Sequence, residues 1–215
     1  NYKLNQFIHV SALGIEKAVD SKYAISKVEG EKNIINIFPK ATILKPSIIF
    51  SVDDDFSCRL MTLLSLLPIF PLYYNGKTKF SPLHVSEICE IISNVIDQNI
   101  CFEKIECVGP EELSFKDIIK KLLISIDKKR ILLPMPFPLA SFSAKIFQLM
   151  PNPLLTEDQL RLLKYDNVLS KKYKSNFDIG VPSKKFFNEE VKKYCYMWRE
   201  GGQFSTEKYL SNKNS

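Results

Sequence analysis

The chain has 215 residues, of which 45% are apolar and 25% charged, and its formal net charge is +6. A chain of this length buries roughly 70% of the surface that its unfolded form exposes, so the composition excludes a disordered tail, a collagen-like chain and a disulfide-stabilised miniprotein. Only four of the 30 basic residues are arginines, and the lysines are scattered. Because nucleic-acid-binding proteins rely on arginine forks with interleaved aromatics, we expect no nucleic-acid partner.

The beginning of the chain predicts one βαβ unit. Residues 7–10 form an apolar run that ends at Ser11, a helix is expected over 22–38, and a second apolar strand over 41–44. Near-continuous apolar strands separated by a helix are typical of a parallel sheet. No signal-peptide pattern precedes the first strand, and the chain starts at Asn1, so we expect a fragment of a longer protein.

The middle of the chain continues the alternation of strands and helices. A polar loop at 53–55 precedes a helix over 56–67, and Asn75-Gly76 predicts a turn between extended segments. A further helix is expected over 86–97 and a strand over 104–108. We therefore predict an α/β fold with an incomplete, Rossmann-type parallel sheet.

The last third is expected to be mainly helical. Ser114 with Asp117 predicts a helix start, Thr156 with Gln159 forms a capping box, and a final helix should reach Arg199. The predicted domains are therefore an α/β part over 1–110, a smaller helical subdomain over 111–200, and a flexible polar tail over 201–215.

Two stretches, residues 60–72 and 131–150, are apolar enough to be candidate membrane segments. The first has about 13 residues, too few to cross a bilayer, and the second contains three prolines and a lysine. We expect no transmembrane helix and interpret both stretches mainly as core. For 131–150 the alternative is an apolar surface that docks on a membrane or a large partner.

Cysteine and histidine usage argues against a metal site. The five cysteines include no C-x-x-C pair, and the chain has two histidines. We expect no metal, and an odd number of thiols fits a reducing compartment such as the cytoplasm or the mitochondrial matrix.

One pair of residues predicts acid–base chemistry. Tyr23 and Lys27 stand four residues apart in the first turns of the predicted helix, which puts both on one face. An ammonium beside a phenol favours the phenolate, so we expect Lys27 to lower the tyrosine pKa from about 10 and allow proton exchange with a substrate. Ser11 lies at the carboxyl end of its strand, where open α/β sheets bind ligands.

The order of these features resembles the short-chain dehydrogenase/reductase superfamily. The matching features are the strand ending in Ser11, Tyr23 with Lys27, and the turn Lys45-Pro46-Ser47-Ile48 after the next strand. The resemblance implies that Ser11, Tyr23 and Lys27 are catalytic. It also implies that Tyr23, Lys27, Pro46, Ser47 and Ile48 bind the nicotinamide end of NADP or NAD.

Further motifs narrow the resemblance to an atypical, extended branch of that superfamily, similar to NAD-dependent epimerases and dehydratases. They are Asp54-Asp55-Phe56, Pro82-Leu83-His84-Val85, Val108-Gly109-Pro110, Leu155-Thr156-Glu157-Asp158-Gln159 and Asp166-Asn167-Val168. This branch contains the nucleotide-binding accessory subunit of respiratory complex I and its bacterial homologues. The resemblance implies a structural cofactor, association with complex I, and a location peripheral to the inner membrane.

Departures from the family pattern leave alternatives open. Ser51 replaces a usual glycine, Lys45 a common arginine and Glu87 a common aspartate, and the upstream Gly-rich phosphate loop is absent from the 215 residues. We therefore expect this chain alone to bind NAD(P) poorly. The rival function is an active reductase or epimerase on a small hydroxyl or carbonyl compound. A third alternative is a split-gene product without independent activity.

Overall fold

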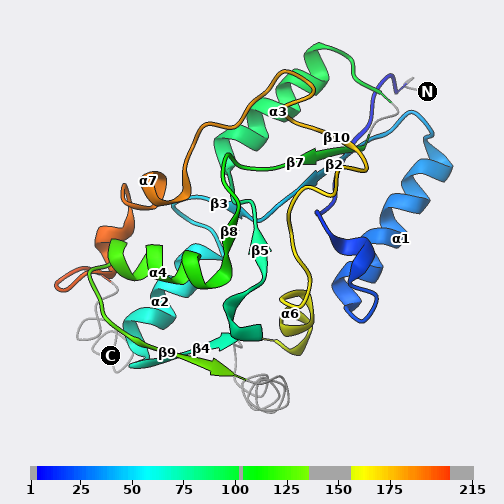
Figure 1. Cartoon of the computed structure of the whole chain (residues 1–215). Coiled ribbons are helices and arrows are strands. Elements are labelled where there is room, and N and C mark those ends of the chain that lie inside the picture. The colour runs from blue at the N-terminus through cyan, green and yellow to red at the C-terminus, as the bar shows by residue number, and fades with distance from the viewer. Residues whose placement is uncertain (1–3, 102–103, 136–155, 204–215) are drawn as a thin grey trace, which may run out of the picture.

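The computed structural model describes residues 4–101, 104–135 and 156–203. Within these residues the main sheet has four parallel strands in the order β1-β2-β7-β10 (Figure 1). They are β1 (Ile8–Val10), β2 (Thr42–Pro46), β7 (Lys104–Cys107) and β10 (Lys174–Ser175). Helix α1 (Lys22–Ile37) connects β1 to β2. The predicted α/β fold with a parallel sheet is confirmed.

The two faces of this sheet have different partners. All five residues of β2 are buried, as expected of a strand covered on both sides. On one face, Leu44 and Ile105 pack against Ile91 of α3 (Val85–Asp97). On the other face, Lys45 forms an ion pair with the carboxylate of Glu31 in α1. Figure 1 shows α3 and α1 on opposite sides of β2 and β7. The face toward α3 therefore packs in an apolar core, whereas the face toward α1 carries buried charges that lie behind the candidate site.

A second core lies away from the main sheet and is mainly helical. It brings together α2 (Ser57–Leu66), α4 (Phe115–Ser125), α7 (Phe187–Val191) and the short 3-10 helix η3 (Cys195–Trp198). This core therefore joins residues from both sides of residue 110, and the predicted division into domains there stays a prediction.

Short two-stranded pairs complete the described fold. β3 pairs with β6 and β4 with β9 in parallel, and β5 pairs with β8 antiparallel. Their bounds are β3 (Ile49–Phe50), β4 (Ile69–Tyr73), β5 (Lys79–Phe80), β6 (Leu83–His84), β8 (Leu113–Ser114) and β9 (Ile131–Met135). The remaining elements are η1 (Ile15–Lys17), η2 (Tyr74–Gly76) and α6 (Glu157–Leu162).

The helix starts predicted from side-chain caps are confirmed. The Ser114 hydroxyl accepts a hydrogen bond from the Asp117 N–H at 3.1 Å, and Thr156 and Gln159 form the expected capping box of α6. The predicted Asn75-Gly76 turn is confirmed as well, since both residues have positive φ in η2. A Cβ on Gly76 would lie 2.8 Å from the Lys116 Cβ, which explains the glycine.

One expectation for the last third is wrong. The single final helix is instead α7 and η3, separated at Tyr194, which has φ −130°. This break allows the Tyr194 hydroxyl to hydrogen-bond the buried Ser57 hydroxyl at 3.1 Å. The region also contributes the strands β9 and β10, and the mainly helical character expected of it stays a prediction, because 136–155 lie outside the described residues.

The two segments expected to dock or to move lie largely outside the described residues. In the predicted docking segment 131–150, residues 131–135 form β9, which pairs with β4, and 136–150 are not described. Of the predicted tail, 204–215 are not described. No helix in the described ranges is both long and apolar enough to cross a bilayer.

Candidate functional site

The residues singled out from the sequence line one cavity of about 720 Å³. Ser11 comes from the end of β1, Tyr23 and Lys27 from α1, and Pro46, Ser47 and Ile48 from the connection between β2 and β3. The fold thus brings together all six predicted site residues from three separate segments. The catalytic and cofactor-binding roles of these six residues stay predictions.

The Ser11 hydroxyl already has a strong partner. It donates a hydrogen bond to Glu31 Oε1 at 2.6 Å, and both residues are buried. Because its proton is directed to this carboxylate, the Ser11 oxygen is left as an acceptor for a substrate hydroxyl. The sequence analysis did not predict a role for Glu31. It stands four residues after Lys27, so the same helical spacing places it on the face of Tyr23 and Lys27.

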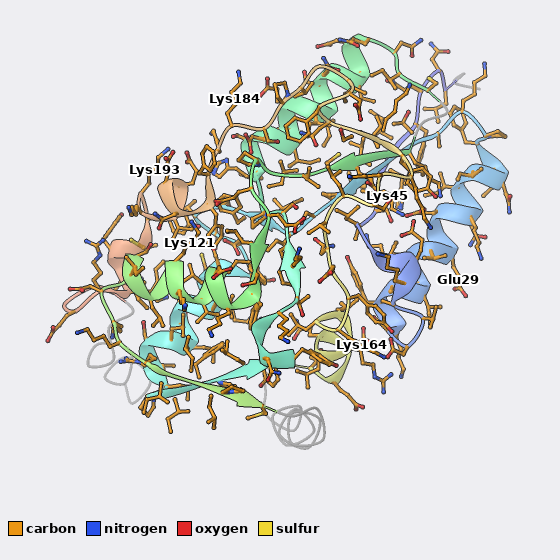
Figure 2. The ribbon with its side chains drawn as sticks, in the orientation of Figure 1. Glu29, Lys45, Lys121, Lys164, Lys184 and Lys193 are labelled. Carbon is orange, nitrogen blue, oxygen red and sulfur yellow. The ribbon has the colours of Figure 1, made fainter. Side chains whose placement is uncertain are left out.

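Glu31 belongs to a buried charge cluster behind the site. Its carboxylate lies 3.3 Å from Lys45 Nζ and 3.0 Å from Lys104 Nζ, and Lys45 also pairs with Glu16. The Lys45 side chain is 1% exposed. Figure 2 shows it inside the molecule, whereas Lys184 and Lys193 lie at the rim. A charge this deep is tolerated only when it is paired, so the cluster fixes α1 against β2 and β7.

Burial opposes the charge on Glu31, but the surrounding donors outweigh it. Hydrogen bonds from Ser11 and Lys104 and the charge of Lys45 lower the pKa of Glu31 below its ordinary value. Glu31 is therefore a carboxylate at neutral pH and an acceptor for Ser11.

Tyr23 and Lys27 lie on one face of α1, as the spacing predicts. Lys27 Nζ is 5.9 Å from the centroid of the Tyr23 ring and 3.5 Å from the Val10 carbonyl oxygen. Partial burial raises the pKa of Tyr23, which is opposite to the expected effect of Lys27. The ammonium thus lies over the ring of Tyr23. Tyr23 is therefore a protonated phenol at neutral pH, suited to donate a proton.

The connection between β2 and β3 is held by one distant side chain. Asn167 Oδ1 accepts hydrogen bonds from the Ser47 hydroxyl at 2.6 Å and the Ile48 N–H at 3.1 Å, while its Nδ2 donates to the Leu13 carbonyl at 2.6 Å. Asn167 therefore fixes both walls of the cavity mouth. Asn167 belongs to the motif Asp166-Asn167-Val168, but nothing in the neighbouring sequence indicates a contact with Ser47, 120 positions away.

Helix α1 is anchored at its first turn by α6. The Asp158 carboxylate accepts hydrogen bonds from the Ser21 hydroxyl, the Lys22 N–H at 2.8 Å and the Tyr23 N–H at 3.1 Å. Burial opposes its charge, but these donors lower the pKa of Asp158. The anion stabilises the helix N-terminus and positions Tyr23.

No cluster of histidine, cysteine or carboxylate residues that could hold a metal ion occurs in the part of the chain that the structure describes.

Comparison with curated proteins gives relatives of about twice this length. The 40 kDa subunit of NADH-ubiquinone oxidoreductase from Neurospora crassa is 24% identical over 183 residues, covering 84% of this chain and 48% of the relative. NADH dehydrogenase [ubiquinone] 1 alpha subcomplex subunit 9 of Mus musculus is 27% identical over 180 residues, covering 83% and 48%. The chain therefore spans about half the length of these relatives. No protein-family model matches it.

Solved structures share the fold. UDP-glucuronic acid 4-epimerase from Bacillus cereus, solved with UDP-glucuronic acid and NAD, matches with a TM-score of 0.61 and 18% identity over 91% of this chain and 62% of its own. The dTDP-glucose 4,6-dehydratase DesIV from Streptomyces venezuelae matches with a TM-score of 0.59 and 15% identity, over 92% and 61%. The chain is thus similar in sequence to these two NADH dehydrogenase subunits, and it shares the α/β fold of the epimerase and the dehydratase.

Proposed function

We propose that the chain forms the nicotinamide side of an NAD(P) site in an accessory subunit of respiratory complex I, with the cofactor held as a structural element. The observation that carries this proposal is the gathering of Ser11, Tyr23, Lys27 and the Pro46–Ile48 connection around one cavity. The names of the relatives support the complex I association. The protein would then work at the matrix side of the inner membrane or an equivalent reducing compartment.

The residues present fit the nicotinamide end of the cofactor. Within the described residues, Lys27 Nζ donates one long hydrogen bond, at 3.5 Å, which leaves two N–H groups for ribose hydroxyls. The Ser47 N–H is bonded to the Cys107 carbonyl and the Ile48 N–H to Asn167, so this connection is rigid before any ligand arrives. A preformed wall costs little ordering on binding. In the structural role the bound cofactor would not turn over, whereas in the second candidate function described below it would be the source of the hydride.

The test compares NADPH affinity with and without the Lys27 ammonium. The protein is expressed with any residues encoded ahead of Asn1, and NADPH fluorescence is titrated against Lys27→Met and the matched control Lys32→Met, an exposed lysine on the same helix. We expect about a tenfold or greater loss for Lys27→Met, because a charge-assisted hydrogen bond is worth about 1.5–3 kcal/mol. Equal affinities for the two variants would contradict the assignment.

The structural role is tested separately. A cofactor that stays bound through purification without turnover, together with co-migration with complex I in mild detergent, supports it. Release of the cofactor on dilution and migration apart from complex I would contradict it.

A second candidate function is reduction of a carbonyl substrate, favoured by Tyr23 lining an open cavity. Its phenol would donate the proton to the substrate oxygen, Lys27 would stabilise the resulting phenolate, and Ser11 would accept a hydrogen bond from a product hydroxyl. Tyr23→Phe is expected to abolish NADPH oxidation with a panel of carbonyl compounds while leaving cofactor affinity within about threefold. Turnover that survives this substitution would remove the candidate.

A further inference from the structure

One wall of the cavity is an apolar stripe of α2 and its ends. Phe56, Leu60, Leu63 and Leu67 line the cavity at spacings of four, three and four residues, which places them on one face of the helix. A different face of α2, carrying Met61 and Leu64, is fully buried in the second core. Phe56, Leu60 and Leu63 also pack against the edge of that core, but the side chains of the stripe are only half-buried, so part of each remains available to the cavity.

The opposite walls are also apolar. They come from β4, β5, β9, α4 and α6, and the residues concerned are Ile69, Phe70, Pro71, Phe80, Phe115, Met135, Leu162 and Leu163. Such a lining takes up hydrocarbon surface at about 25 cal/mol per Å². Of the polar lining residues, Ser11, Tyr23 and Lys27 come from the end of β1 and from α1, whereas Asp55 and Arg59 lie at the beginning of α2. We call Ser11, Tyr23 and Lys27 the polar head of the cavity and its apolar lining residues the apolar body.

The charges of the lining do not suit a diphosphate. Among the described lining residues the basic side chains are Lys27 and Arg59, and Arg59 lies 3.9 Å from the carboxylate of Asp55. Asp166 adds a further acidic side chain. Since a nucleotide sugar carries two negative phosphates, it would need more cationic or N–H donors than this wall offers.

From this arrangement we propose that the cavity binds a linear aliphatic ketone or secondary alcohol, with its oxygen at Tyr23 and its chain along α2. The position of the oxygen rests on the proposed function, whereas the apolar body is a property of the cavity itself. Phe56 and Leu67 flank the ten residues of α2 and are 11 positions apart, or about 16 Å along the helix, which matches an extended chain of about a dozen carbons. A volume of about 720 Å³ lies within the usual range for a pocket that encloses such a ligand.

The first experiment measures affinity against chain length. The chain is titrated by calorimetry with 2-alkanones of six to twelve carbons, without cofactor, and with UDP-glucose. We expect affinity to rise about fourfold with each added methylene, as burial of a CH₂ group predicts, and no binding of UDP-glucose. Affinity that is flat across the series, or micromolar binding of UDP-glucose, would overturn the proposal.

The second experiment locates the chain. Methyl NMR on leucine- and isoleucine-labelled protein should show 2-dodecanone shifting the signals of Leu60, Leu63 and Leu67 but not that of Ile124, which is 71% exposed on α4. Leu63→Gln should weaken 2-dodecanone about tenfold or more, and the control Ile124→Gln should leave it unchanged. If Leu63→Gln fails to fold, the test rests on the methyl shifts of the unmodified protein. Shifts that appear at Ile124 but not at Leu60, Leu63 and Leu67 would contradict the proposal.

These measurements separate the two proposals, because neither uses NADPH. Chain-length-dependent binding together with an NADPH affinity that ignores Lys27 would overturn only the nicotinamide site. The reverse result would overturn only the aliphatic ligand.

Discussion

At the scale of single residues, Glu31 links the candidate chemistry to the fold. Its carboxylate accepts the Ser11 hydroxyl at 2.6 Å while it pairs with Lys45 and Lys104. The four-residue spacing of Tyr23 and Lys27 predicts that they share one face of the helix. Glu31 stands a further four residues along the chain and lies on the same face. Its burial was not predictable, because an acidic residue at that position of a helix is usually solvated.

We predict that Glu31→Gln lowers the free energy of unfolding by about 3 kcal/mol, because it leaves the buried Lys45 with only the partly exposed Glu16. The control is Glu29→Gln, an exposed residue on the same helix (Figure 2), which should change stability by less than about 0.5 kcal/mol. Urea denaturation measures both. Equal effects of the two substitutions would show that the buried cluster contributes no stability.

The lowered pKa of Glu31 also predicts a pH dependence. A carboxylate whose pKa is lower in the folded state stabilises the protein above its unfolded pKa, near 4.5, and this stability is lost as pH falls through the folded value. The stability difference between the unmodified protein and Glu31→Gln should therefore be constant at pH 6–7 and shrink below about pH 4.5. A difference that stays unchanged down to pH 3 would contradict the ionised form.

At the scale of elements, the sequence was informative wherever a local signal exists. The caps at Ser114 and Thr156 and the turn at Asn75-Gly76 follow from side-chain chemistry within a few residues, and the structure confirms them. Strand β10 has only two residues, Lys174 and Ser175, and forms by pairing with β7. No local pattern predicts such a strand. The break between α7 and η3 is likewise accompanied by a contact distant in sequence, the hydrogen bond between the Tyr194 and Ser57 hydroxyls.

Helix α1 should depend on its anchor from α6. We predict that Asp158→Ala lowers the free energy of unfolding by about 1–2 kcal/mol, because three donors at the start of α1 lose their acceptor. Glu157→Ala, its neighbour, removes only the partly buried i,i+4 pair with Arg161 and should cost about 0.3–0.5 kcal/mol. Thermal unfolding compares them, and a larger cost for Glu157→Ala would refute the anchor.

The motif Val108-Gly109-Pro110 has a steric explanation. A Cβ on Gly109 would lie 1.7 Å from the Pro82 carbonyl oxygen, so we predict that Gly109→Ala destabilises the fold by about 3 kcal/mol or more. Gly30→Ala, with no atom within 4 Å in the middle of α1, should instead stabilise it by about 0.5–1 kcal/mol. Chemical denaturation decides, and a neutral Gly109→Ala would mean that the backbone separates at this contact.

At the scale of the whole molecule, the sequence predicted the parallel sheet and the six residues that line the cavity, because the order of motifs follows the order of strands. It did not predict the apolar body of the cavity. That feature needs α2, β4 and β9 to converge with α6, and these elements are separated by up to about 100 residues of chain. The shape of the cavity is therefore a tertiary property that only the fold reveals.

We propose above that Tyr23, Lys27 and the Pro46–Ile48 connection form the nicotinamide side of a dinucleotide site. The most direct test of this assignment is an NMR titration of the 215-residue chain with nicotinamide mononucleotide and, separately, with adenosine monophosphate. We expect the nicotinamide compound to shift the backbone signals of Tyr23, Lys27, Ser47 and Ile48 at millimolar concentration, and the adenosine compound to leave them unchanged. Equal shifts from both compounds, or none from either, would contradict this assignment.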